Sequence, residues 1–189
     1  MPTKAIIFDL YGVLGLNGWQ AFKLKHFSER PQDWEHLRAL GQRVDTGQAT
    51  QAELVQALVA TTGESTATIR YQFEHTVPNV ELLDYIETLR PRYKIGLLSN
   101  ASHDVVGEVF TREQAQLFDE MVSSFHVGLA KPDPKMFRLM AQKLGVDPSE
   151  CVMVDDQTRH IAAAKKLGMK TVLYASVEQT KEAIEGLIT

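Results

Sequence analysis

The chain has 189 residues, enough for one ordinary domain with a small insertion, and 44% of them are hydrophobic, so a sizeable core can form. The formal net charge is −4 and there is no run of Lys or Arg, which argues against a nucleic-acid partner and against an anionic membrane surface. No apolar run is long enough to span a bilayer, and the single cysteine, Cys151, excludes an internal disulfide and is typical of the reducing cytoplasm.

The first predicted element is a buried strand that ends at a carboxylate. Ile6, Ile7 and Phe8 form a short apolar run that stops at Asp9, and Gly12 follows. Such a run is typical of a parallel strand whose two faces are both covered. Ligand crevices in open α/β sheets lie at the carboxyl ends of the strands, so Asp9 is a candidate site residue.

The next part of the chain has helical spacing. Trp34, Leu37 and Leu40 lie on one face of a helix, and Thr50 with Glu53 forms a capping box before a second helix. A small bundle of helices is therefore expected after the first strand. Its aromatic residues are expected to form its core: Trp19, Phe22, Phe27, Tyr71 and Phe73.

Helices and strands alternate in the remainder. The further strands are predicted over residues 95–98, 121–122, 151–154 and 171–173. Pro134 suits the first turn of a helix that Gly145 ends. This alternation predicts an α/β fold with a doubly wound parallel sheet. The core domain is expected over 1–14 and 80–189, with a helical cap over 15–79.

Polar residues of distinct types follow the predicted strands: Asp9, Ser99 with Asn100, Lys131 in its loop, and Asp155 with Asp156. The carboxyl ends of parallel strands meet at one edge, so these side chains are expected to face one crevice. Three neighbouring carboxylates repel one another unless a cation joins them, and hard oxygen ligands suit Mg²⁺. A lysine and uncharged donors beside them suit a phosphoryl group, with Asp9 free to act as a nucleophile.

Four segments in this order resemble the motifs of the haloacid dehalogenase-like (HAD) hydrolase superfamily: FDLYGVL, LLSN, the lysine of AKPDP, and MVDDQTRHIAAAKKLGM. The resemblance extends over nearly the whole chain and is closest to the small helical-cap subgroup that resembles sugar-phosphate phosphatases. It implies a Rossmann-like core. It also implies a Mg²⁺-dependent phosphatase that hydrolyses a small phosphomonoester of the sugar-phosphate type through an aspartyl-phosphate.

The resemblance also implies a metal site. Asp9 would be both the nucleophile and a Mg²⁺ ligand, and the backbone carbonyl of Tyr11 would be a second ligand. Asp156 would be the third protein ligand, and Asp155 would support the metal through its outer shell or a bound water.

A phosphate site is implied beside it. Ser99 and the backbone of Asn100 would hold phosphate oxygens, and Lys131 would orient Asp9 and neutralise the phosphoryl group. Tyr11 would also contact the substrate.

Two residues depart from the family's pattern. Phosphatases of this family usually carry a second Asp two residues after the nucleophile, but this chain has Tyr11 there. A phenol with a pKa of about 10 is a poor base near neutrality, and losing general acid–base catalysis costs about 10²–10⁴-fold in rate. His160 stands where Asp or Asn is common. His160 and His103 are both expected to be surface residues rather than replacements for the missing base.

Two alternative functions remain. The motif D-x-Y-G also matches metal-independent 2-haloacid dehalogenases, although the pair Asp155 and Asp156 is atypical of them. The missing second Asp is also compatible with a weakly active or inactive binding protein. Neither the substrate nor the choice between monomer and homodimer follows from the sequence.

Overall fold

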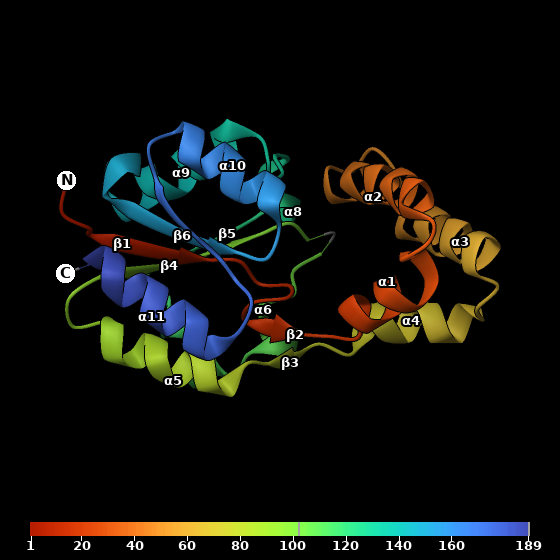
Figure 1. Ribbon diagram of the computed structural model, residues 1–189, viewed down its shortest axis with the longest axis horizontal. Helices are drawn as coiled ribbons and strands as arrows, with labels where there is room; N and C mark the ends of the chain where they lie inside the picture. Colours follow the sequence, from red (N-terminus) through yellow and green to blue (C-terminus); the bar gives the residue numbers. More distant parts are fainter. Residues whose placement is uncertain (102, 189) are drawn as a thin grey trace.

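The structure is a computed structural model that describes residues 1–101 and 103–188; the side chains of residues 20, 73 and 74 lie outside the described set. Figure 1 shows a central sheet between layers of helices, with a group of four helices beyond the carboxyl ends of its strands. The strands of the sheet are β1 (Ala5–Phe8), β4 (Lys94–Ser99), β5 (Glu120–Ser123), β6 (Cys151–Asp155) and β7 (Lys170–Leu173).

The sheet confirms the predicted fold class. Its strand order is β5-β4-β1-β6-β7, and every neighbouring pair is parallel. Its helices and helical turns are α5 (Val80–Leu89), α6 (Val106–Val109), α7 (Arg112–Ala115), α8 (Ser124–Val127), α9 (Pro134–Leu144), η1 (Pro148–Glu150), α10 (Thr158–Lys166) and α11 (Val177–Ile188). This is a doubly wound α/β sheet with β1 at its centre.

Both faces of β1 are covered, as its apolar run predicts. Ala5 and Ile7 pack in one hydrophobic cluster with residues of α9 and α10. Ile6 and Phe8 pack in the other cluster with residues of α5 and α11. Figure 1 shows these helix pairs on opposite faces of the sheet. Each fully buried Ile or Phe side chain stabilises the fold by about 1.5–3 kcal/mol. The position of Asp9, directly after β1, is therefore fixed by a strand whose four residues are all fully buried.

Local signals in the sequence fix several helix ends. Thr50 and Glu53 form the predicted capping box at the start of α3 (Gln51–Thr62). Pro134 is the first residue of α9, and Gly145 ends this helix with a φ of +68°, a conformation that favours glycine. The alternation of helices and strands predicts a helix after β4, and the helix that begins there, α6, spans only four residues.

Four helices lie between the short strands β2 (Gly15–Leu16) and β3 (Val77–Pro78): α1 (Trp19–Phe27), α2 (Pro31–Asp45), α3 and α4 (Thr66–Glu74). They share their own hydrophobic cluster, which includes Phe22 and Phe27 and against which Trp19 packs. Tyr71 is exposed, so its predicted place in this core is wrong. The side chain of residue 73 lies outside the described set.

The helical group is joined to the sheet by a two-stranded connection that the sequence did not indicate. β2 and β3 pair antiparallel, with Gly15 opposite Pro78 and Leu16 opposite Val77. The backbone N–H of Asn79 donates to Leu14 O, and its side-chain amide donates to Val13 O. The two segments that connect the sheet to the helical group are therefore hydrogen-bonded to each other.

The structure also describes the single cysteine and the length of the helices. Cys151 is a buried, free cysteine at the start of β6, and burial raises the pKa of its thiol to about 12, so it is an inert core residue. Among the described residues, no helix is both long enough and apolar enough to cross a membrane.

Candidate active site

The carboxyl ends of the sheet's strands bring the predicted residues to one place. Asp9 directly follows β1, Ser99 is the last residue of β4, and Asp155 is the last residue of β6. All three side chains are buried, with 4%, 1% and 0% exposure. In Figure 1 this edge of the sheet faces the group of four helices.

Lys131 lies at the centre of the cluster and is 1% exposed. Its Nζ is 2.7 Å from Asp9 Oδ1 and 2.8 Å from Asp155 Oδ2. Burial alone would lower the pKa of Lys131, but the charges of Asp155 and Asp9 raise it above its ordinary value. The lysine is therefore a permanent cation between two carboxylates.

Asn100 holds the backbone of Lys131 with two hydrogen bonds. The Asn100 side-chain amide donates to Lys131 O at 2.9 Å, and the Lys131 N–H donates to Asn100 Oδ1 at 2.8 Å. The sequence predicted that Asn100 lies in the crevice. It did not predict that the Asn100 side chain would be hydrogen-bonded to the backbone of the loop that carries Lys131.

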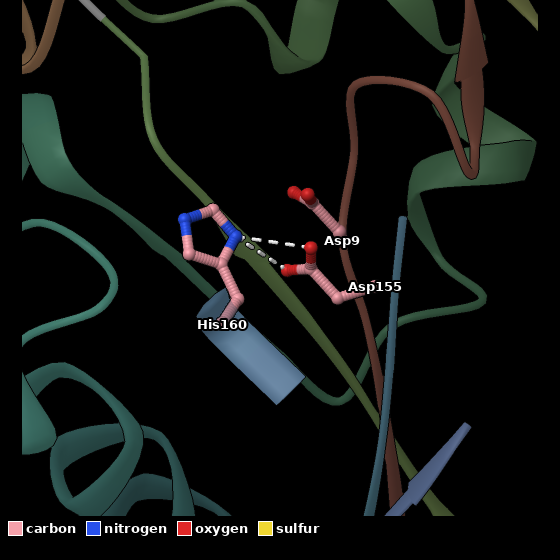
Figure 2. A group of neighbouring side chains, drawn as sticks. All are labelled: Asp9, Asp155 and His160. Carbon is pink, nitrogen blue, oxygen red and sulfur yellow. Dashed lines mark hydrogen bonds and ion pairs between the residues drawn. The ribbon is translucent and has the colours of Figure 1, made fainter. Parts of the chain in front are cut away.

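The hydrogen-bonding capacity of Asp155 is largely used by protein groups. Besides Lys131, it accepts from the Gln157 N–H at 2.9 Å and contacts His160 Nδ1 at 3.0 Å through both oxygens. Burial opposes the ionisation of Asp155, but Lys131 and His160 together hold its pKa below the usual value. Figure 2 shows the imidazole turned towards this carboxylate. Asp155 is thus a fixed anion that supports Lys131.

His160 is not the surface residue that its sequence context predicted. It is 1% exposed, and its Nδ1 faces Asp155 because α10 begins two residues before it and carries it over the end of β6. Burial lowers the pKa of His160, although Asp155 raises it in part, so the imidazole is neutral near pH 7. His103 is partly exposed, and its Nε2 lies 3.1 Å from Glu108 Oε2.

Asp9 and Asp156 retain free oxygens. Asp9 Oδ1 accepts from the Leu10 N–H at 2.6 Å and from Lys131, whereas its Oδ2 has no hydrogen-bond partner among the described residues. Asp156 Oδ1 is buried and also lacks a partner within that part of the chain. Burial and the neighbouring carboxylates raise the pKa of Asp9, and burial with the charge of Asp155 raises that of Asp156 to about 6.

Gly12 makes the approach of Asp156 possible. Its φ is +82°, and a Cβ at this position would lie 2.7 Å from Asp156 Oδ2. A side chain here would therefore be strained and would displace the carboxylate. Glycine at position 12 thus lets the tight loop after β1 pass close to the Asp156 carboxylate.

The cluster fits a hard divalent cation. Asp9, Asp155 and Asp156 carry three potential negative charges near one ammonium group. Burial first, and then the charge of Asp155, raise the pKa values of Asp9 and Asp156. A cation would satisfy the orphaned oxygen of Asp156 and the free oxygen of Asp9. One ligand atom each from Asp9, Asp155 and His160 also lies within 4.8 Å of the others, but the Nδ1 of His160 faces Asp155.

Two buried serine hydroxyls lie at the carboxyl ends of β4 and β5. Ser99 Oγ and Ser123 Oγ are buried without a hydrogen-bond partner among the described residues, and the two serines are register neighbours on β4 and β5. Such hydroxyls can donate to an anion's oxygens. The sequence predicted Ser99 but not Ser123, because the strand that Ser123 ends had only two recognisable apolar residues.

Tyr11 is half-buried, and burial, followed by the charges of Asp45, Glu108 and Asp9, raises the pKa of its phenol well above 10. The phenol stays protonated at neutral pH, so it can donate a hydrogen bond but cannot act as a base. Asp45 is the last residue of α2, outside the motifs of the sequence, and its effect on Tyr11 is a finding of the structure.

Known proteins with similar sequences include an epoxide hydrolase and two phosphatases. The chain is 26% identical over 214 residues to bifunctional epoxide hydrolase 2 of Sus scrofa, covering 98% of the chain but only 39% of that enzyme. It is 27% identical to phosphatase MT3486 of Mycobacterium tuberculosis, covering 97% of the chain and 93% of the relative. Fructose-1-phosphate phosphatase YqaB of Escherichia coli is 30% identical over 58% of each chain.

Solved structures show the same fold. A HAD-like family hydrolase from Porphyromonas gingivalis superposes with a TM-score of 0.69 and 25% identity over 100% of this chain and 98% of that one. A HAD family enzyme from Bacteroides thetaiotaomicron, in complex with magnesium and inorganic phosphate, superposes with a TM-score of 0.65 and 24% identity, covering 92% and 94% of the two chains.

The family model described as haloacid dehalogenase-like hydrolase matches residues 3–168, which include every strand-end residue of the site. Because this match extends over most of the chain, the protein belongs to the haloacid dehalogenase-like hydrolases.

Proposed function

We propose that the protein is a Mg²⁺-dependent phosphatase that hydrolyses a small phosphomonoester through a phosphorylated Asp9. The observation that carries the proposal is the state of Asp9: Lys131 and the Leu10 N–H fix one oxygen, and the other has no hydrogen-bond partner among the described residues. A carboxylate that two donors hold in one orientation is prepared to attack a phosphorus atom.

The metal ligands are proposed to be Asp9, the Tyr11 carbonyl and Asp156, with Asp155 supporting them. The bound ion would neutralise charge on the phosphoryl group as it is transferred. The free oxygens of Asp9 and Asp156 support this choice, as does the magnesium in the related solved structure. The engagement of Asp155 with Lys131 and His160 favours its supporting role over direct ligation.

The remaining groups are proposed to act on the phosphate. The hydroxyl of Ser99 and the backbone of Asn100 would donate to its oxygens, and the ammonium group of Lys131 would stabilise its negative charge. Attack by Asp9 on phosphorus would release the alcohol, and water would then attack the phosphorus of the aspartyl-phosphate to release inorganic phosphate.

A phosphorylated small molecule, of the sugar-phosphate type, is proposed as the substrate. The mycobacterial relative is called a phosphatase, and the Escherichia coli relative is called a fructose-1-phosphate phosphatase. Residues 15–79 are proposed to act as a cap that closes the crevice, because α1–α4 form a separate hydrophobic cluster on the side of the strand ends.

A phosphatase assay with p-nitrophenyl phosphate tests the proposal. Turnover is expected with Mg²⁺ and should be lost with EDTA and in Asp9→Asn, which keeps the shape of the side chain. Asp84→Asn is the matched control, since Asp84 is exposed on α5 and has no described hydrogen-bond or ion-pair partner. Turnover that survives EDTA or Asp9→Asn would contradict the proposal.

The same preparation tests the alternatives. A 2-haloacid dehalogenase would release halide without metal. A binding protein would bind Mg²⁺ and phosphate in calorimetry while a broad panel of phosphate esters stays intact.

A further inference from the structure

We propose that Asp45, the last residue of α2, is the acid–base residue that stands in for the carboxyl replaced by Tyr11. The inference rests on the proposed phosphatase activity. It assigns a catalytic task to the group of four helices and gives the reaction a proton donor and acceptor.

The position of Asp45 supports this role. It ends α2, is half-buried, and makes no hydrogen bond or ion pair with any described residue. Its sequence neighbours Gln42, Arg43 and Thr46 line a cleft of about 300 Å³, and the opposite wall includes Lys131 and its loop neighbours. Figure 1 also shows α2 reaching towards the carboxyl edge of the sheet. Asp45 is thus an acid without a described partner, and it lies next in the chain to residues through which the helical group meets the lysine loop.

The electrostatics of Asp45 connect it with the site. Burial raises its pKa to about 6, although Arg159 of α10 and Lys131 oppose the shift. Its charge raises the pKa of the Tyr11 phenol more than the charge of Asp9 does. A carboxyl that titrates near the working pH can both donate and accept a proton, as acid–base catalysis requires.

Other residues near the site are less suitable. The Nδ1 of His160 is held by Asp155, and its Nε2 is buried without a partner in the described part of the chain. The Tyr11 phenol is protonated, and His103 pairs with Glu108. Asp155 is an anion fixed by Lys131.

The proton transfers balance over two steps. In the first step Asp9 forms a bond to phosphorus and the phosphorus–oxygen bond to the alcohol breaks; the leaving oxygen keeps the electron pair and takes the proton of the Asp45 carboxyl. In the second step water attacks phosphorus and gives a proton to the Asp45 carboxylate. The bond between phosphorus and Asp9 breaks, which regenerates both carboxyl groups and releases inorganic phosphate.

A comparison of leaving groups tests the assignment. An alkyl phosphate such as glycerol phosphate needs a proton on its leaving oxygen, whereas p-nitrophenolate leaves without one. In Asp45→Asn, kcat/KM for glycerol phosphate is expected to fall about 10²–10⁴-fold. With p-nitrophenyl phosphate, a rapid release of one equivalent of nitrophenol should persist and be followed by slow turnover, because the second step has lost its base. Asp33→Asn on the same helix is the control and should leave both substrates unchanged.

The outcomes separate this inference from the proposed function. An inactive wild type, or an active Asp9→Asn, contradicts the phosphatase itself. An active wild type with Asp45→Asn unchanged on glycerol phosphate overturns only the role of Asp45. Asp45→Asn could also lose the nitrophenol burst and the glycerol phosphate turnover equally, with unchanged thermal stability. That result would overturn the role of Asp45 as well. Asp45→Glu retains a carboxyl and should recover part of the glycerol phosphate turnover; if it recovers none while still folded, the assignment fails.

Discussion

Replacing Lys131 with Met tests whether the buried lysine holds the carboxylate cluster together. The Met side chain fills a similar volume but leaves Asp9 and Asp155 without the ammonium group that lies 2.7 and 2.8 Å from their oxygens. Both carboxylates are buried, so water cannot replace the lost partner. Breaking a buried ion pair in this way costs about 3–5 kcal/mol. Since a domain of this kind is typically stable by about 5–15 kcal/mol, the loss should be a large part of the total.

The assay is urea unfolding at pH 7 in EDTA, followed by circular dichroism, which gives the free energy of unfolding in the absence of metal. Lys135→Met is the control, because Lys135 is exposed on α9 and its side chain has no described partner, and a surface change of this kind shifts stability by less than about 0.5 kcal/mol. Adding Asp155→Asn to Lys131→Met should recover part of the loss, since it removes one unpaired charge. A loss below about 1 kcal/mol for Lys131→Met would refute the reasoning.

The pH dependence of this variant has a definite sign. Without Lys131, the pKa of Asp9, which is already raised, rises further in the folded state, and the pKa of Asp155 rises because it loses the positive charge that holds it low. The folded state then binds more protons than the unfolded state, so stability falls as pH rises through these pKa values. The deficit of Lys131→Met against the wild type should therefore shrink as pH is lowered from 7 to 4. A deficit that grows towards low pH would contradict the cluster of charges.

Further predictions concern the carboxylates and the loop after β1. Asp156→Asn should abolish Mg²⁺-dependent activity yet stabilise the metal-free protein at pH 7 by about 1–2 kcal/mol. The pKa of Asp156 is about 6 in the folded state and 3.8 in the unfolded chain, so its ionised form destabilises the folded state above pH 6. Solvent screening reduces the size of this effect. Unfolding in EDTA measures this, and a destabilised variant would contradict it. Gly12→Ala and Gly47→Ala both place a side chain at positive φ, but only the former meets Asp156. Both should lower thermal stability, and only Gly12→Ala should weaken Mg²⁺ binding in calorimetry; equal Mg²⁺ affinities would refute the role of Gly12. Asp45→Asn should melt no lower than the wild type at pH 7, because the carboxylate it removes has no partner in the described part of the chain and its pKa of about 6 makes its charge destabilising there. A large drop in melting temperature would indicate a structural role instead.

The strands and the residues at their ends could be predicted from the sequence because local signals specify them. Apolar runs such as 6–8 require burial on both faces, and parallel pairing brings the strand ends to one edge. The carboxylates Asp9 and Asp155 and the lysine that joins them therefore follow from the order of the strands and the motifs.

Other parts of the site depend on contacts that no local pattern specifies. The strands β2 and β3 are two residues each, too short for a periodic signal, and they pair across about sixty residues of chain. His160 has the helical context of a surface residue, and only the docking of α10 against β6 buries it beside Asp155. Asp45 is distant in the chain from every motif, and its nearness to the site follows from the placement of the helical group.

Detection of a phosphorylated Asp9 tests the central claim most directly. The protein is incubated with Mg²⁺ and acetyl phosphate, quenched in acid, digested and analysed by mass spectrometry. The account predicts one phosphoryl group on the peptide that contains Asp9, present in Asp45→Asn at higher occupancy than in the wild type, and absent with EDTA and in Asp9→Asn. A phosphoryl group on another residue, one that persists in EDTA, or none in either Asp45→Asn or the wild type would contradict it.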